Sequence, residues 1–375
     1  MTTPPRFDIF LTTAPGLEAT LLAEVRGKGF RQPKAVPGGV VIEGGWPEVW
    51  RANLWIRGAG RVLARLDHFH VTHLAQLDLR ARHVPWADVL RPDIPFRVEA
   101  TCAASKLYHS GAVEQRIATA IRETLGAPEA PAGGIPDAVT VMARIEHDRC
   151  TISLDTSGAP LHKRGYKEAV NPAPLRETMA SLFLQQCGYD GREPLVDPMC
   201  GAGTFVIEAA EIAARLNPGR LRHFAFEQFA NFDAEAWARM RGVESRRPPA
   251  ALCHGSDRDA GAVAMSRDNA VRAGVAEHTA FRQCTISDAV PPEGPPGLVM
   301  VNPPYGTRMG DKGDLVPLYR ALGQVLRQRF SGWRVGLVTS EGSLAQATGL
   351  PFVAPGAPVP HGGLRVTLYR TAALG

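Results

Sequence analysis

The residues best placed to do chemistry follow the apolar run Leu298–Val301 and are Asn302, Pro303, Pro304 and Tyr305. The two prolines fix φ and donate no backbone hydrogen bond, so a strand must end before them. The side-chain oxygen of Asn302 and the carbonyl of Pro303 can both accept a hydrogen bond, and Tyr305 offers a stacking face. Two acceptors beside a ring face suit an amino group that is attached to a planar ring.

Such a site predicts catalysis by orientation and electrostatics. The lone pair of the amine is delocalised into its ring, and two acceptors that hold both amine hydrogens turn the lone pair toward an incoming electrophile. A proline-rich loop after a core strand is the alternative, because a four-residue string also arises by chance.

A second candidate segment is the glycine-rich turn Asp197–Thr204 (DPMCGAGT), which lies between an apolar stretch at 194–196 and a helical pattern at 205–216. Glycines between a strand and a helix let the backbone approach a ligand and expose the amides at the helix start. The turn contains neither G-x-G-x-x-G nor G-K-[ST]. This disfavours a dinucleotide or a nucleoside triphosphate as the ligand.

Two more carboxylates follow predicted strands: Asp257 after the stretch 252–256, and Asp288 just past 281–284. A carboxylate at the end of a second parallel strand suits the two hydroxyls of a ribose, and Asp288 could accept a hydrogen bond from an adenine amine. Each aspartate alone is more commonly a helix cap or a turn residue. Their placement after successive strands favours a nucleoside site.

The elements that must position these residues alternate between strand and helix from about residue 175 onward, which predicts a parallel, doubly wound α/β sheet. The expected strands there are 194–196, 252–256, 281–284, 298–301, 333–339 and 364–370, and the expected helices are 175–187, 205–216, 262–273 and 315–330. The amino-terminal part predicts α+β structure, with strands at 7–11, 40–42, 56–66, 96–101, 139–145 and 150–155 and helices at 17–25 and 113–125. We therefore expect domains at 1–53, 54–157 and 158–375.

The composition supports a globular protein of two or three domains. The chain has 375 residues, 45% of them apolar and 21% charged. Its net charge of +5 and its excess of arginine favour a polyanionic partner, although a GC-rich genome gives the same bias. The six cysteines form no C-x-x-C pair, so we expect neither a zinc site nor another metal site. We expect a cytoplasmic protein, because neither a signal peptide nor an uncharged run of about 20 residues is present.

Two polar segments could bind nucleic acid: the loop Ser105–Ser110 (SKLYHS) and the basic linker 161–167 (LHKRGYK). Lysine, arginine and histidine can bind phosphate, and tyrosine can stack on a base. A solvated turn and a solvated linker are the alternatives. The candidate RNA-binding residues are Lys106, Tyr108, His109, Lys163, Arg164 and Tyr166.

The segments DPMCGAGT at 197–204, GSDRD at 255–259 and NPPYG at 302–306, in this order, resemble a class I S-adenosylmethionine-dependent methyltransferase. PLRET at 174–178 and FAFE at 224–227, with Phe232, Asp233 and Trp237, are similar to THUMP-domain RNA guanine-N2 methyltransferases of the large-ribosomal-subunit branch. SKLYHS at 105–110, LDTSG at 154–158 and HKRGY at 162–166 resemble the THUMP region of that family. Ala202 and Phe229 depart from the family pattern, where serine and tryptophan are usual.

The resemblance implies a ferredoxin-like module, a THUMP domain that binds RNA, and a Rossmann-like catalytic domain whose last strand, 364–370, is antiparallel. It implies S-adenosylmethionine as the cofactor and Asn302, Pro303, Pro304 and Tyr305 as catalytic residues. The implied cofactor-binding residues are Asp197, Met199, Cys200, Gly201, Gly203, Thr204, Asp257, Arg258, Asp288 and Asn302.

The function that this resemblance implies is formation of N2-methylguanosine, with 23S rRNA favoured over tRNA as the substrate. We expect a monomer that makes one modification. An adenine-N6 DNA methyltransferase and a protein glutamine methyltransferase are alternatives because they share the Asn-Pro-Pro-Tyr chemistry. A catalytically decayed RNA-binding assembly factor is a fourth possibility, which intact Asp197, Asp257, Asp288 and Asn302 disfavour.

Overall fold

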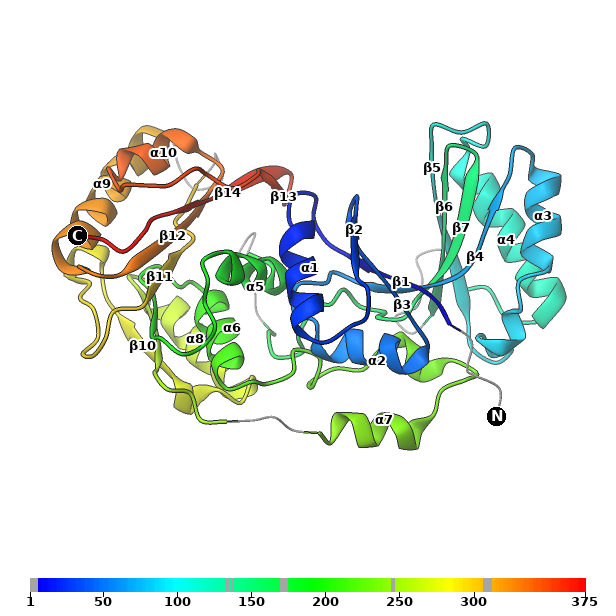
Figure 1. Ribbon diagram of the computed structural model, residues 1–375, viewed down its shortest axis with the longest axis horizontal. Coiled ribbons are helices and arrows are strands. Elements are labelled where there is room, and N and C mark those ends of the chain that lie inside the picture. The colour runs from blue at the N-terminus through cyan, green and yellow to red at the C-terminus, as the bar shows by residue number, and fades with distance from the viewer. Residues whose placement is uncertain (1–5, 132–134, 136–137, 169–174, 244–246, 306–311) are drawn as a thin grey trace. The chain divides into compact units, whose positions relative to one another are not determined.

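The computed structural model describes residues 6–131, 135, 138–168, 175–243, 247–305 and 312–375. The chain divides into two compact units, drawn from blue at the amino terminus to red at the carboxyl terminus in Figure 1. Unit 1 comprises Met1–Thr13, Val25–Leu161 and Arg222–Val243, and unit 2 comprises Ala14–Glu24, His162–Leu221 and Glu244–Gly375. Within the described ranges, no helix is long and apolar enough to span a bilayer.

Unit 1 contains one seven-stranded sheet in the order β2-β3-β1-β4-β7-β6-β5, in which only β5 and β6 pair in parallel. Its strands are β1 (Phe7–Thr12), β2 (Lys34–Val36), β3 (Gly39–Gly44), β4 (Val62–His70), β5 (Phe96–Ala103), β6 (Val139–Glu146) and β7 (Arg149–Asp155). The beginning of β4 pairs with β1, and Leu63–His70 pairs with β7, with a register shift between Arg65 and Asp67. The two amino-terminal domains expected from the sequence therefore share a single sheet.

The helices of the amino-terminal half are α1 (Glu18–Gly27), α2 (Trp46–Trp55), α3 (Leu74–Arg82) and α4 (Ser110–Leu125). The sequence analysis missed α2, α3 and β2, and it began the strand of β4 too early, at Ile56. Gly45 and Pro47 start α2, which buries Val49, Trp50 and Leu54. Helix α2 ends at Trp55, and β4 begins only at Val62. The residues between them, which the sequence analysis assigned to the strand, connect the two elements.

The segment Arg222–Val243 packs within unit 1, although its place in the sequence lies inside the predicted catalytic domain. It contains a short 3₁₀ helix, η2 (Ala225–Gln228), and α7 (Ala234–Arg241). The Phe226 ring stacks on that of Trp50 of α2 at 6.0 Å, and it meets the Trp237 ring edge-on at 5.0 Å. Burial of these large aromatic rings stabilises the packing of the segment within unit 1.

Unit 2 contains the predicted doubly wound sheet, in the order β10-β9-β8-β11-β12-β14-β13. Strands β8 (Leu195–Asp197), β9 (Cys253–Asp257), β10 (Thr279–Gln283), β11 (Leu298–Val301) and β12 (Arg334–Thr339) are parallel, and β14 (Leu364–Arg370) pairs antiparallel with β12 and β13 (Val359–His361). The antiparallel last strand is confirmed. The helices of this unit are α5 (Glu177–Gln186), α6 (Thr204–Ala213), α8 (Ala260–Arg272), α9 (Lys312–Arg329) and α10 (Gly342–Ala347).

Side chains of β11 alternate between the two faces of this sheet. Val299 and Val301 join the apolar core beneath α9 and α10, which lie on one face (Figure 1). The sulfur of Met300 lies 3.9 Å from that of Cys187, the residue that ends α5, on the other face. Strand β11 is buried on both faces, as expected for a central parallel strand.

The basic linker packs inside unit 2. Arg164 is a buried ion-pair partner of Glu208 of α6, with Nε 2.9 Å from Oε1 and side-chain exposures of 3% and 0%. Tyr166 is also buried, and the ammonium group of Lys167 lies 2.6 Å from a carboxylate oxygen of Glu177. The prediction that Arg164 and Tyr166 bind RNA is therefore wrong, because α6 carries a buried glutamate that needs a cation and the linker supplies it.

We expect Arg164→Met to lower the free energy of unfolding by about 3–5 kcal/mol, because it leaves the Glu208 carboxylate buried without this partner. Urea denaturation measures the change. Lys163→Met is the matched control: Lys163 is exposed and adjacent in sequence, so its loss should change stability little. Equal effects of the two substitutions would contradict a structural role for Arg164.

Candidate active site

The order of the strands brings the predicted site residues to one edge of the sheet. Strand β8 lies between β9 and β11 and is parallel to both. The turn after β8, Asp257 at the end of β9 and Asn302 after β11 therefore share the carboxyl edge, at the point where the strand order reverses. Open α/β sheets bind their ligands at this position.

Hydrogen bonds hold the glycine turn in place. The Gly201 amide donates to Oδ2 of Asp257 at 3.0 Å, and the Ser266 hydroxyl of α8 donates to the Gly201 carbonyl at 2.7 Å. Gly203 has a φ of +80°, which favours glycine, where α6 begins. A Cβ atom at Gly255 would lie 2.6 Å from the Phe281 ring, so only glycine lets β9 pass here. Contacts with β9 and α8 therefore fix the conformation of the glycine turn.

Asp257 fits the role of a ribose ligand better than Asp259. Its Oδ1 accepts from the Asp259 amide at 3.0 Å and its Oδ2 from Gly201, which leaves lone pairs on both oxygens. The carboxylate of Asp259 instead caps α8 by accepting from the Gly261 amide at 2.8 Å. Arg258 is exposed between them.

Asp197 is almost fully buried, with 2% exposure, and its Oδ1 accepts from the Met199 amide at 3.1 Å. Burial raises the pKa of Asp197 from 3.8 to about 8, and the nearby charge of Asp257 adds to this shift. Asp197 is therefore mainly a neutral acid at pH 7.

Two of the predicted cofactor ligands use their side chains in contacts within the protein. The thiol of Cys200 is buried 3.8 Å from the Ser266 hydroxyl, and burial raises its pKa. The hydroxyl of Thr204 accepts from the Lys167 ammonium at 2.8 Å.

Asp288 ends a short 3₁₀ helix, η4 (Ile286–Asp288), beyond β10. It is exposed, and its carboxylate accepts from the Thr285 hydroxyl at 2.7 Å. Gln283, at the end of β10, pairs with Asp257 across the two strands. Strand β10 lies on the side of β9 away from β8, and the Asp288 turn that follows it packs against α9, whose Arg329 donates to the Ser287 and Ala289 carbonyls at 2.9 and 3.0 Å.

The side-chain oxygen of Asn302 is buried and has no hydrogen-bond partner among the described residues. Pro303 is buried beside it, and Tyr305 is half-buried, which raises the pKa of its hydroxyl to about 12. A buried acceptor without a donor is costly, so this atom is suited to a donor that arrives with a ligand. Gly306 and Pro174 lie outside the described residues.

The sequence analysis missed a residue that touches this loop. The hydroxyl of Tyr319, on α9, lies 3.2 Å from the Pro304 carbonyl and 3.2 Å from the Thr339 hydroxyl at the end of β12. Tyr319 shares the buried face of α9 with Leu315, Leu322 and Leu326. A tyrosine within an otherwise apolar helical stripe indicated a buried hydroxyl that needs a partner. The sequence does not identify that partner.

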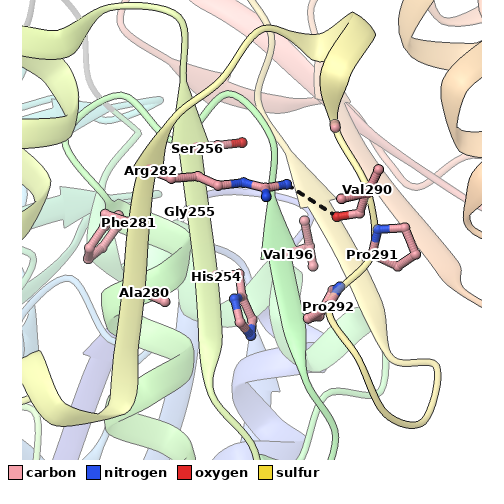
Figure 2. A pocket seen from close by; sticks show the side chains of 11 residues that line it. Val196, His254, Gly255, Ser256, Ala280, Phe281, Arg282, Val290, Pro291 and Pro292 are labelled. Carbon is pink, nitrogen blue, oxygen red and sulfur yellow. Dashed lines mark hydrogen bonds between the residues drawn. The ribbon is translucent and has the colours of Figure 1, made fainter.

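The Figure 2 pocket, of about 220 Å³, lies elsewhere on the sheet of unit 2. Its walls include Val196, His254 and Arg282 from β8, β9 and β10, and Arg282 donates to the Val290 carbonyl at 3.4 Å. Burial and the nearby Arg282 lower the pKa of His254. Neither the glycine turn nor Asn302 lines this pocket, so it is not the candidate active site.

The remaining candidate RNA-binding residues are exposed. In unit 1, Tyr108 has 82% exposure and Lys106 is exposed, whereas the His109 ring caps α4 by accepting from the Ala112 amide at 3.3 Å. The loop is held by the Lys106 amide, which donates to Asp148 at 2.7 Å. Lys163, in unit 2, is exposed as well.

Three family descriptions match the chain. Residues 8–63 match an RlmL ferredoxin-like domain, residues 71–155 a THUMP domain, and residues 164–352, half of the chain, the RMKL-like methyltransferase domain. The chain belongs to the RMKL-like methyltransferase family. Its catalytic domain is therefore a class I methyltransferase fold.

Relatives of this RMKL-like methyltransferase include the ribosomal RNA large subunit methyltransferase K/L of Psychromonas ingrahamii, 34% identical over 91% of this chain and 47% of the relative. The chain spans about half the length of the curated relatives it matches. A Listeria monocytogenes protein described as a predicted N6-adenine-specific DNA methylase is 31% identical over 98% of this chain and 97% of its own, with a TM-score of 0.87. SMU.472, solved as a complex with SAH, is 26% identical over both full chains, with a TM-score of 0.87.

S-adenosylmethionine is the cofactor of this kind of domain, and the geometry of the RMKL-like chain fits it. Asp257 and Ser266 pin the glycine turn, the Asp257 carboxylate keeps lone pairs on both oxygens, and no large side chain can stand at Gly255. These features suit the amino-acid and ribose parts of the cofactor.

We expect Asp257→Ala to weaken S-adenosylmethionine binding by about 1–3 kcal/mol, because charge-assisted hydrogen bonds to the ribose are lost. Calorimetric titration measures the affinity. Asp259→Ala is the control, since that carboxylate caps α8 and should leave the affinity nearly unchanged. If the folded Asp257→Ala protein binds S-adenosylmethionine with wild-type affinity, Asp257 does not bind the ribose.

We expect the cofactor-free protein to lose stability relative to Asp197→Asn as the pH rises from about 5 to 8. The pKa of Asp197 is higher in the folded state, so folding favours the protonated acid, and that contribution is full below the ordinary pKa and lost toward pH 8. Asparagine keeps the shape and does not titrate. Urea denaturation across this pH range measures the difference, and parallel profiles for the two proteins would contradict a buried neutral Asp197.

Proposed function

We propose that this methyltransferase forms N2-methylguanosine in large-subunit ribosomal RNA, in the cytoplasm. The observation that carries the proposal is the buried Asn302 oxygen, which lacks a donor among the described residues. An exocyclic amine inserted beside it would supply that donor. The THUMP match and the name of the Psychromonas relative support an RNA substrate of the large ribosomal subunit.

The cofactor supplies an electrophilic methyl group, and we assign its contacts to the carboxyl edge of the sheet. The backbone of Gly201 and Gly203 would hold its amino-acid part, the Asp257 carboxylate would accept from the ribose hydroxyls, and Asp288 would accept from the adenine amine. Because Asp197 is mainly neutral at pH 7, it adds little negative charge beside the turn.

The target guanine must leave any base stack to reach this edge, as bases generally do in enzymes that act on them. Its ring would pack on Tyr305, while the Asn302 oxygen and the Pro303 carbonyl accept the two amine hydrogens. This turns the nitrogen lone pair toward the methyl group, and preorganised acceptors stabilise the positive charge that develops on nitrogen. The nitrogen would form a bond to the methyl carbon while the bond from that carbon to the cofactor sulfur breaks, which leaves S-adenosylhomocysteine. The resulting cation would then lose one proton to water.

We propose that residues 54–157 contribute RNA binding through Lys106 and Tyr108, residues 158–375 catalysis, and 1–53 a supporting module. An exposed aromatic ring beside an exposed lysine suits a nucleotide, with the base on the ring and the phosphate on the ammonium group. His109 is a weaker candidate because its ring caps α4. Lys163 is the remaining candidate on the linker.

Transfer RNA is the second candidate substrate, since a THUMP domain does not name the RNA. Adenine in DNA and glutamine in a protein also present planar amines, and the Listeria relative is described as acting on adenine in DNA. The THUMP match favours RNA over both.

Mass spectrometry of 23S rRNA and tRNA from a deletion strain, complemented with wild type or Asn302→Ala, tests the proposal. We expect N2-methylguanosine to disappear from one 23S rRNA position without the enzyme and to return only with wild type. Loss of a single preorganised acceptor costs on the order of 100–1000-fold in turnover, with cofactor affinity nearly intact.

Asn302→Asp is the matched variant, because it keeps an acceptor oxygen at the same place and should retain more activity than Asn302→Ala. A folded Asn302→Ala enzyme with more than about a tenth of wild-type turnover would refute amine orientation by this residue. If the deletion strain loses N2-methylguanosine from tRNA and not from 23S rRNA, tRNA is the substrate.

A further inference from the structure

The loop that follows β11 contains two consecutive positions that lack a backbone hydrogen-bond donor. Pro303 and Pro304 have no N–H, so the segment between Asn302 and Tyr305 can be anchored at these positions only through its carbonyls. A donor from another part of the chain can hold such a carbonyl and so fix the position of the loop.

Tyr319 is that donor. Its side chain is fully buried, and its hydroxyl lies 3.2 Å from the Pro304 carbonyl and 3.2 Å from the Thr339 hydroxyl. A carbonyl can only accept, so the single Tyr319 proton goes to Pro304, and the Thr339 hydroxyl donates to the Tyr319 oxygen. The Glu341 amide donates to Thr339 in turn, at 3.2 Å.

The chain of hydrogen bonds thus runs in one direction, from Glu341 through Thr339 and Tyr319 to Pro304. It ties the end of β12 and helix α9 to the loop after β11. Burial raises the pKa of Tyr319 to about 12, so the phenol keeps its proton at neutral pH. Each member satisfies a polar group that burial would otherwise leave unpaired.

We propose that Tyr319 and Thr339 are positioning residues for methyl transfer. By fixing the Pro304 carbonyl they fix the peptide between Pro304 and Tyr305, and so both the stacking ring and the preceding acceptors. Neither residue touches the reacting atoms. The proposal rests on the proposed function of the Asn302 loop, and it adds the residues that hold this loop in the reactive geometry.

Single-turnover and steady-state methylation by Tyr319→Phe tests the proposal. Phenylalanine keeps the ring in the core and removes only the hydroxyl. We expect kcat to fall about 10–100-fold, as small displacements of a reactive geometry do, with little change in the KM for RNA or the affinity for S-adenosylmethionine. Thr339→Val should lower kcat in the same direction, and Thr339→Ser, which restores a hydroxyl, should recover it.

Tyr189→Phe is the matched control. Tyr189 is a buried tyrosine of the same unit whose hydroxyl donates to the Ala209 carbonyl at 3.4 Å, away from the loop. It should lose comparable stability and keep wild-type kcat. The proposal is overturned if Tyr319→Phe keeps kcat within about twofold of wild type, or if Tyr189→Phe loses kcat equally, because the effect would then be one of general stability.

Identification of the wild-type product by mass spectrometry separates this proposal from the proposed function. If the wild type methylates an amine other than guanine N2, the proposed function fails. The Tyr319→Phe comparison then decides the positioning role on that other amine.

Discussion

The parallel pairing of β8 with β9 on one side and β11 on the other is the constraint on which the catalytic unit depends. It places the glycine turn, Asp257 and Asn302 at one edge, although they come from three separate parts of the sequence. The approach of β11 to β8 is close: a Cβ atom at Gly297 would lie 2.0 Å from the Pro194 carbonyl. Glycine at this position lets β11 enter beside β8, and this pairing brings Asn302 to the edge that carries the glycine turn and Asp257.

Buried carboxylates near this edge are stabilised in two different ways. Glu208 of α6 is paired with Arg164, and the two charges compensate each other. Asp197 has no cation paired with it in the described part of the chain, and it is mainly protonated instead. Burial penalises charge in both cases, so the protein either pairs the group or neutralises it. The first solution fastens the linker to the catalytic unit, and the second keeps charge low beside the cofactor turn.

Unit 1 depends on contacts between distant parts of the sequence. Its single sheet is continuous because β4 pairs with both β1 and β7, and the rings of Phe226 and Trp237 pack against Trp50 of α2. The chain therefore leaves the catalytic unit after α6, packs within unit 1 and returns before β9. A family motif around Phe226 that the sequence associates with the methyltransferase thus has a packing role in the amino-terminal unit.

The sequence by itself determined the strand–helix alternation and the residues that end β8, β9 and β11, because apolar periodicity, glycine and proline act locally. The antiparallel direction of the last strand came only from the family resemblance. It could not determine the fate of the basic linker: Arg164 and Lys163 are both cations in a polar segment, and only the position of Glu208 on α6 decides that one is buried. It missed α2, whose buried Trp50 packs against the rings of Phe226 and Trp237, two residues that are distant in the sequence. The sequence analysis also missed Tyr319. Its hydroxyl lies on an apolar helix face, and only the tertiary structure places the Pro304 carbonyl beside it.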